Sequence, residues 1–227
     1  MGQPAIALKT RSLREQVQDA IRQSIMSREL QPGDPIREMH FARHFQVSQA
    51  TVREALLELE QMGFVVREAN RGTRVVKLGP DDIRNLLDIR IALEPIAAKA
   101  AASRMNEGDF QRLDSLLAEI LQCVEGNEYL GMYQADLAFH RCIWDLSGNP
   151  YLVQALERVT VPIFAGNVII MSKEGTQLTD IVRSHEPILK AMRTKVPRSI
   201  EREVKNHIRL SYDSHLTNPI WHEAQGR

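Results

Sequence analysis

Residues 46–62, with the sequence QVSQATVREALLELEQM, predict a helix that begins directly after a capping serine. The hydroxyl of Ser48 can accept a hydrogen bond from the free N–H groups of the first helical turn. Apolar side chains then recur at helical spacing and form one buried stripe: Val52, Ala55, Leu56 and Leu59. Polar side chains near the helix start are expected to face outward: Gln49, Thr51 and Arg53. The predicted helix therefore spans about residues 49–62 and has one buried face and one exposed face.

The segment before this helix completes a helix-turn-helix. Apolar periodicity predicts helices over about 11–28 and 38–44, separated by the helix-breaking sequence LQPGDP at 30–35. Two short helices joined by a short turn, the second capped and polar at its start, are typical of this motif.

The segment after the helix changes to a period of two. Residues 64–77 alternate as strands do, with Asn70, Arg71 and Gly72 at the tip, and this predicts a basic hairpin. A helix-turn-helix followed by such a hairpin is a winged helix. The alternative is a small packed domain with a solvated hairpin, but packing gives no reason to combine Ser48, Arg53 and a basic wing.

Residues 33–76, GDPIREMHFARHFQVSQATVREALLELEQMGFVVREANRGTRVV, resemble the DNA-binding domain of GntR-type bacterial transcription regulators. The VS-x-x-TVREAL core, the xxGF after it and the RGT-x-VV wing carry the resemblance, which covers residues 11–78. It implies that the outward residues of the recognition helix contact bases and phosphates: Ser48, Gln49, Thr51 and Arg53. It also implies that the wing tip, Arg71 and Gly72, approaches the minor groove.

Two positions depart from the family pattern. Met39 and Gln49 stand where arginines are common, and glutamine pairs better with adenine than with guanine. We therefore expect DNA binding to persist on an altered operator. Since one winged helix recognises one half-site, a homodimer on a palindromic double-stranded operator is expected.

Composition excludes several classes of protein. The chain has 227 residues, 43% of them hydrophobic but only 5% aromatic, which favours helices over a β-sandwich. It has no apolar run of the roughly 18 residues that a membrane span needs, and no secretory signal at its start. Cys123 and Cys142 both fall in helical patterns, as reduced core thiols of a cytoplasmic protein would. No membrane partner is expected.

Charge separates the two parts of the chain. Residues 1–78 hold 12 Lys and Arg against 9 Asp and Glu, and the remainder holds 17 against 20. A basic N-terminal module suggests an anionic partner, although the bias is too small to indicate nucleic-acid binding without a motif.

The C-terminal module, residues 81–218, has helical patterns throughout and predicts a six-helix antiparallel bundle. With the winged helix-turn-helix at 10–78, the fold class is mainly α. The predicted helices span about 82–104, 109–125, 128–146, 150–171, 178–195 and 198–216.

Three of these helices carry candidate metal ligands. Asp136 and His140 are four residues apart and share one helix face, while His185 and His207 lie on later helices among apolar neighbours. Buried imidazoles and a carboxylate need partners, and this set suits zinc, or nickel or another divalent transition metal. The alternative is a set of core histidines satisfied by one another and by water.

The bundle resembles the FCD ligand-binding domain of the FadR subfamily, in its shorter VanR-like branch. The Asp-x-x-x-His pattern followed by two single histidines carries the resemblance, and it implies a metal ion that anchors a small carboxylate effector. It also implies that Arg90 clamps that effector, against the alternative of a surface ion pair with Glu94. Pro187 departs from the expectation of a regular helix and should bend the fifth helix beside His185.

Three functions remain to be weighed. The first is a regulator whose operator affinity responds to a carboxylic acid bound at the metal, and its alternative is a regulator that responds to the ion itself. A metal-dependent hydrolase is disfavoured because no Ser or Cys nucleophile and no Gly-rich phosphate loop is evident. We therefore expect no enzymatic activity and no catalytic residues.

Overall fold

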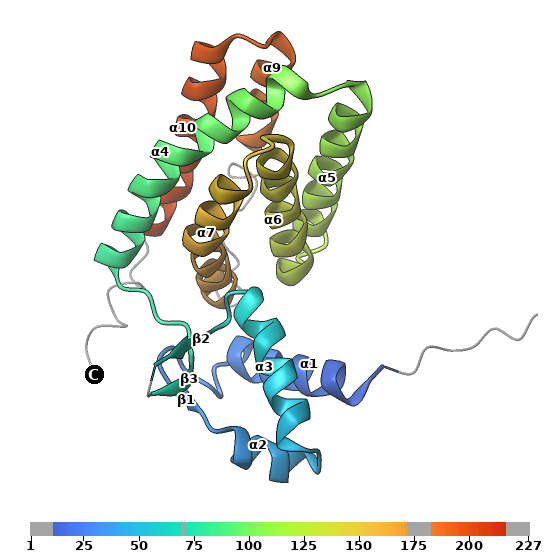
Figure 1. The fold of residues 1–227 in the computed structure, drawn as a ribbon, viewed down its shortest axis with the longest axis vertical. Coiled ribbons are helices and arrows are strands. Elements are labelled where there is room, and N and C mark those ends of the chain that lie inside the picture. The colour runs from blue at the N-terminus through green and yellow to red at the C-terminus, as the bar shows by residue number, and fades with distance from the viewer. Residues whose placement is uncertain (1–10, 70, 172–182, 217–227) are drawn as a thin grey trace, which may run out of the picture. The chain divides into compact units, whose positions relative to one another are not determined.

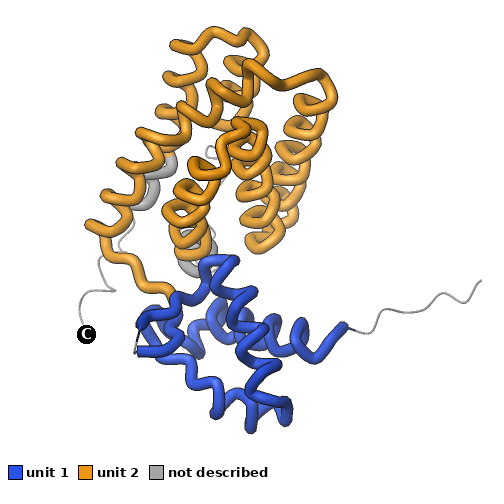
Figure 2. The backbone as a smooth tube through the Cα atoms, viewed as in Figure 1, with its two compact units in different colours: residues 1–75 blue, residues 76–227 orange. Residues whose placement is uncertain are grey.

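The computed structural model describes residues 11–69, 71–171 and 183–216. The chain divides into two compact units, residues 1–75 and residues 76–227 (Figure 2). Each unit has its own core of buried side chains.

The first unit is built on three helices, α1 (Leu13–Met26), α2 (Glu38–Phe45) and α3 (Gln49–Gln61) (Figure 1). Helix α1 packs against α3. The side chains buried between them are Val17, Ile21 and Ile25 of α1 and Val52, Ala55, Leu56 and Leu59 of α3. The predicted apolar stripe of the recognition helix is therefore confirmed.

The turn between α2 and α3 is short because both ends are capped. Gln46 ends α2 in the left-handed conformation, with φ 55°. Ser48 starts α3, and its hydroxyl accepts a hydrogen bond from the Thr51 N–H. The predicted capping role of Ser48 is confirmed.

The wing is part of a three-stranded antiparallel sheet with the order β1-β3-β2. The hairpin strands β2 (Val65–Glu68) and β3 (Gly72–Val75) pair so that Glu68 lies opposite Gly72. The strand β1 (Pro35–Ile36) joins the other edge of β3 and was not predicted. A strand of two residues is too short to show an alternating pattern, and one of its residues is a proline. It can be recognised only from its pairing with β3. Asn70, predicted at the wing tip, lies outside the described residues.

The second unit has six described helices: α4 (Pro80–Arg104), α5 (Glu107–Glu125), α6 (Tyr129–Leu146), α7 (Pro150–Met171), α9 (His185–Thr194) and α10 (Pro197–Leu216). Their bounds follow the predicted ranges closely except at α9. Ala98, Ala101 and Ala102 of α4 contribute to the core and let its neighbours approach closely, while Phe110, Leu113 and Phe139 provide bulk. Cys123 and Cys142 are buried and form no disulfide. No helix in the described residues combines the length and apolarity of a membrane span.

The predicted fifth helix, about residues 178–195, is described only from residue 183 onward, and it is interrupted at Ser184, directly beside His185. Helix α9 starts at His185, so Pro187 lies in its first turn, and positions 178–182 lie outside the described residues. N–H groups of a first turn have no acceptor within the helix, so the proline costs no hydrogen bond of α9. His185 therefore stands at a helix start, directly after Ser184.

Candidate functional sites

The exposed start of α3 places the predicted DNA-contacting side chains together. Ser48 and Gln49 are exposed, and the Ser48 hydroxyl lies 2.9 Å from that of Thr51 and 3.1 Å from its N–H. The side chain of Arg53, one turn further along, is 56% exposed. Thr51 is half-buried, so it contributes to the cap as well as to the outer surface.

Arg53 is held by Glu38 of α2. The Nε atom of Arg53 lies 3.2 Å from both carboxylate oxygens of Glu38, and Nη2 lies 2.8 Å from Oε2. The hydrogen bond from Arg53 to Glu38 raises the pKa of the guanidinium above its usual value. This side-on pair leaves the Nη1 donors free to point elsewhere. Glu38 was not among the predicted site residues, because no local pattern connects residues so far apart in sequence.

The wing contributes a group of arginines. Arg71 and Arg74 lie 3.9 and 3.8 Å from Glu68 Oε2, and the Arg71 side chain remains 74% exposed. Gly72 has φ +78°, a conformation that side chains other than glycine rarely adopt, although a Cβ there would meet nothing within 4 Å. The wing arginines Arg67, Arg71 and Arg74 line an open hollow of about 770 Å³ together with Arg37, which lies at the start of α2.

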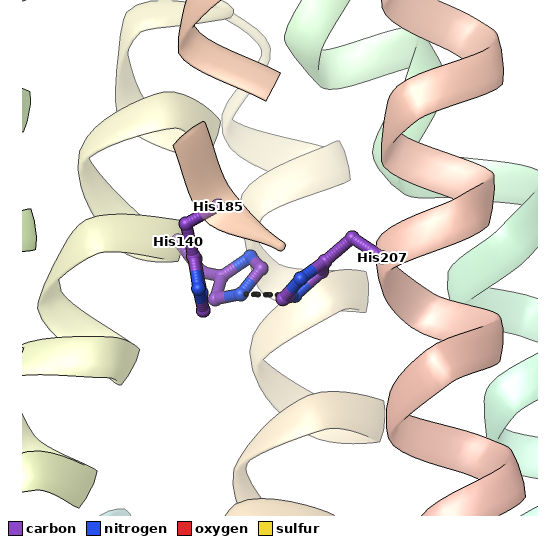
Figure 3. Close-up of side chains that lie close together, drawn as sticks. All are labelled: His140, His185 and His207. Atoms are coloured by element: carbon purple, nitrogen blue, oxygen red, sulfur yellow. Dashed lines mark hydrogen bonds between the residues drawn. The ribbon is translucent and has the colours of Figure 1, made fainter. Parts of the chain in front are cut away.

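Three histidines converge inside the helical unit (Figure 3). His140 comes from α6, His185 from α9 and His207 from α10, and their side chains are at most 2% exposed. One nitrogen of each lies within 4.8 Å of the others. The Nε2 atoms of His140 and His207 are 3.2 Å apart. Burial lowers the pKa of His207 well below its usual value, with further contributions from His185 and His140, so this imidazole is neutral.

Asp136 borders this group rather than belonging to its closest set. Its Oδ1 atom lies 2.9 Å from His185 Nε2 and 3.5 Å from His140 Nε2. Burial opposes ionisation of Asp136, but His185 and His140 lower the pKa below its usual value, so the group is a carboxylate. All four predicted ligands therefore lie together, with Asp136 at the edge.

Two further side chains orient the histidines. Glu94 Oε2 lies 3.1 Å from His140 Nδ1, and Ser184 Oγ lies 2.7 Å from His207 Nδ1. Because a carboxylate can only accept, Nδ1 of His140 carries the proton of this hydrogen bond. Such outer partners fix imidazole ligands in many metal sites. Neither role was predicted, because no sequence motif connects Glu94 with His140 or Ser184 with His207.

Arg90 lies beside the same group. Its Nε donates to Glu94 Oε1 at 2.6 Å, and the two side chains are 2% and 4% exposed. The ion pair considered in the sequence analysis therefore exists, but it is buried instead of lying on the surface. Burial opposes ionisation of Glu94, but Arg90 and His140 lower its pKa to about 2. Arg90 Nη2 is buried, and no hydrogen-bond partner for it is found among the described residues.

The sequence matches two family models. Residues 13–75 match the model described as bacterial regulatory proteins, gntR family, and residues 85–210 match the FCD domain. A probable D-xylose utilization operon transcriptional repressor from Paenarthrobacter nicotinovorans is 30% identical over 193 residues, 85% of this chain and 84% of that protein. The transcriptional regulator LutR of Bacillus subtilis is 30% identical over 189 residues, 74% of this chain and 85% of that protein.

Solved structures share the fold. McbR/YncC of E. coli has a TM-score of 0.70 at 20% identity, covering 92% of this chain and 100% of that chain. A putative GntR regulator from Rhodococcus sp. RHA1 has a TM-score of 0.66 at 20% identity, covering 91% and 98%.

Proposed function

Since the chain belongs to the gntR family of bacterial regulatory proteins and carries an FCD domain, it is a DNA-binding transcription regulator, and we propose that a small carboxylic acid, bound at the three-histidine centre, controls its operator affinity. Its relatives are regulators and not enzymes, in agreement with the expectation from sequence. The convergence of buried imidazoles from separate helices beside a buried arginine carries the proposal.

The residues of the centre fit a divalent metal ion. With His140 neutral and its Nδ1 protonated, the lone pair of its Nε2 faces His207 Nε2 at 3.2 Å, and either a proton or a cation between the two nitrogens would satisfy that approach. His140, His185 and His207 would hold the ion, with Asp136 as a fourth ligand, and this donor set suits zinc, or nickel as a second choice. A bound ion would supply a positive centre that attracts a carboxylate.

Charge and hydrogen bonding favour an anionic effector. Arg90 and Glu94 balance each other, so the two charges of a divalent ion would be balanced by Asp136 and one effector carboxylate. Among the described residues no acceptor is found for the buried Nη2 of Arg90, and an unpaired buried donor is costly. A carboxylate would accept from it. Glu94 holds the guanidinium in place for that contact.

The winged helix would deliver the output. Arg53 and Gln49 of α3 would contact base edges in the major groove, Ser48 and Thr51 would contact phosphates at the helix start, and the wing with Arg71 and Gly72 would approach the minor groove. Two copies would bind a palindromic operator. We assign the protein to the cytoplasm, where its DNA target lies.

A thermal-shift screen tests the effector proposal. Small mono- and dicarboxylic acids are added to zinc-loaded protein and to protein treated with chelator. An acid at 100 times its Kd should stabilise the loaded protein by about 2.7 kcal/mol and the chelated protein much less. D-xylose belongs in the panel because one relative is named for a xylose operon. Stabilisation by the sugar alone, independent of chelator, would contradict the proposal.

Arg90→Met separates the roles within the site. It should keep metal binding, measured by elemental analysis, and lose the response to the carboxylic acid. Arg141→Met is the matched control, because Arg141 pairs with Glu157 at 2.6 Å on the half-exposed side of α6. Equal acid responses in Arg90→Met and wild type would remove Arg90 from the effector site.

Regulation by the ion itself is the second candidate, and the complete burial of the histidines favours it. The ring centroids of His185 and His207 lie only 4.2 Å apart. Histidines this close form a closed group that needs no organic ligand. Operator affinity is measured by fluorescence anisotropy at defined metal occupancy. If it follows occupancy and no organic acid changes it, the second candidate is correct.

A further inference from the structure

Thr160 of α7 carries a buried hydroxyl group. The residue is 0% exposed, and no hydrogen-bond partner for its Oγ1 atom is found within the described part of the chain. A threonine inside a helix commonly bonds through its hydroxyl to a main-chain carbonyl one turn earlier, so this arrangement is unusual. A buried hydroxyl without a partner costs free energy, and a ligand that bonds to it would remove that cost.

Helix register places Thr160 level with the histidine centre. Helices α6 and α7 pack side by side (Figure 1), and only residues 147–149 connect them. Two helices joined by so short a turn run antiparallel, so residues equally distant from the turn lie at the same height. Asp136 is twelve residues before position 148, and Thr160 is twelve residues after it. Thr160 therefore lies at the height of Asp136, one of the candidate ligands.

The face of α7 that carries Thr160 is directed at Arg90 and His140. Phe164 lies four residues after Thr160 and shares that face, because i and i+4 are neighbours on a helix. The Phe164 ring centroid is 5.1 Å from Cζ of Arg90 and 5.5 Å from the centroid of the His140 ring. Nη2 of Arg90 is also buried and also lacks a partner among the described residues. Two unsatisfied polar groups from different helices therefore adjoin one centre.

The charges of the centre favour a neutral group beside Thr160. Arg90 is the one lysine or arginine buried in the described part of the helical unit, and Glu94 already balances it. A divalent ion would be balanced by Asp136 and by one effector carboxylate. A second carboxylate beside Thr160 would then be buried without a counter-charge, which is costly. A hydroxyl carries no charge and can both donate and accept.

We propose that Thr160 determines specificity by binding a hydroxyl group of the effector, which makes the effector a hydroxy monocarboxylic acid. The carboxylate binds the ion and Arg90, and the hydroxyl exchanges a hydrogen bond with Thr160 Oγ1. The inference rests on the proposed function and names the chemical class that the same site selects. Discrimination follows because an acid that lacks the hydroxyl leaves Thr160 Oγ1 buried and unsatisfied.

Isothermal titration calorimetry of the zinc-loaded full chain tests this with acids that differ by one hydroxyl. Butanoate and hexanoate are compared with their monohydroxy derivatives, substituted at each carbon in turn, and with succinate. At least one hydroxy acid should bind about tenfold more tightly than its parent acid, the scale for leaving a buried polar group unpaired, and more tightly than succinate. Equal affinities within each series, or tightest binding of succinate, would overturn the inference and leave the proposed function intact. Absence of binding by every acid would contradict both.

Thr160→Val removes the hydroxyl at nearly constant size. It should bind the parent acid no more weakly than wild type but lose the preference for the hydroxy acid, whereas Thr160→Ser should keep the preference. Thr73→Val is the matched control, because Thr73 is a buried threonine of the other unit, 7% exposed. Elemental analysis checks that the zinc content is unchanged. A full preference for the hydroxy acid in Thr160→Val would overturn the inference.

A second measurement does not depend on finding the effector. In zinc-loaded, effector-free protein, Thr160→Val should unfold at a higher temperature than wild type, because a methyl group replaces a hydroxyl that lacks a partner. Circular dichroism melting measures the difference. A lower unfolding temperature of the valine variant would show that the hydroxyl is already satisfied in the free protein, and the inference would fall.

Discussion

At the residue scale, one edge of the Arg53 guanidinium is occupied by a protein contact, and Arg53 is proposed to contact DNA with the rest. The Nε edge of its guanidinium is fixed on Glu38, and the opposite end stays open at the exposed start of α3. An arginine fixed in this way loses little conformational freedom on binding, which favours a specific contact over a diffuse one. The pair is an orientation device more than a stabilising ion pair, because the side chains are 56% and 25% exposed and solvent screens them.

Arg53→Ala should weaken operator binding by about 1–3 kcal/mol, the range for a good base contact. Fluorescence anisotropy with operator and scrambled DNA measures the loss, which should be larger on the operator. Glu38→Gln should have the same sign and a smaller size, because the guanidinium remains but loses its fixed direction.

Arg14→Ala provides the control for this prediction. Arg14 forms a comparable exposed pair with Glu58 at 3.3 Å but lies on α1. An Arg53→Ala variant that binds operator as tightly as Arg14→Ala would remove Arg53 from the DNA-contacting set.

The buried pair of Arg90 and Glu94 allows a second prediction. Glu94→Gln keeps an acceptor for His140 but leaves the Arg90 charge uncompensated, so the free energy of unfolding should fall by about 3–5 kcal/mol. The double variant Arg90→Met/Glu94→Met should lose less, since no lone charge remains buried. Urea unfolding gives both values, and additive losses in the double variant would contradict the coupling.

At the element scale, side-chain caps decide where several helices begin. Ser12, Ser48 and Asn106 each accept from an N–H of the first turn of α1, α3 and α5. Apolar periodicity alone predicted these helices to within a few residues, because periodicity and caps are both local. By contrast, β1 was missed, because its partner strand β3 is distant in sequence.

The cap of α5 gives a prediction about stability that does not involve the DNA-binding residues. Asn106 Oδ1 accepts from the Asp109 N–H at 3.1 Å, and Asp109 accepts in return from the Asn106 N–H at 2.9 Å. Asn106→Ala should therefore reduce the free energy of unfolding by about 1 kcal/mol, and Asn106→Ser by less. Urea unfolding measures this. DNA affinity should not change, and equal stability of the alanine and serine variants would argue against the cap.

At the scale of the whole molecule, the proposed effector site and the winged helix belong to different units. The proposed effector site lies within residues 76–227, and the winged helix within residues 1–75. An effector alters DNA affinity only through a difference in its own affinity for the two states of the protein. The coupling is therefore a free energy shared by both sites.

Reciprocity follows from that sharing. Bound effector changes the operator affinity by some factor, and bound operator should change the effector affinity by the same factor. Typical factors are about 5–150. Isothermal titration calorimetry in both orders measures the two ratios. Scrambled DNA serves as the control, and unequal ratios would rule out linkage between these two sites.

The sequence by itself determined the winged helix, the number of described helices in the bundle and the four candidate ligands, because helical period, caps and a shared helix face are local properties. Only the tertiary structure decided that His140, His185 and His207 meet, that Glu94 serves both Arg90 and His140, and that Glu38 holds Arg53. It also decided that the Arg90 pair is buried, which the i,i+4 spacing left open. Most of these features are contacts between different helices. The burial of the Arg90 pair depends on which helices cover that face of α4. Burial by a neighbouring helix leaves no signal in the spacing of the buried residues themselves.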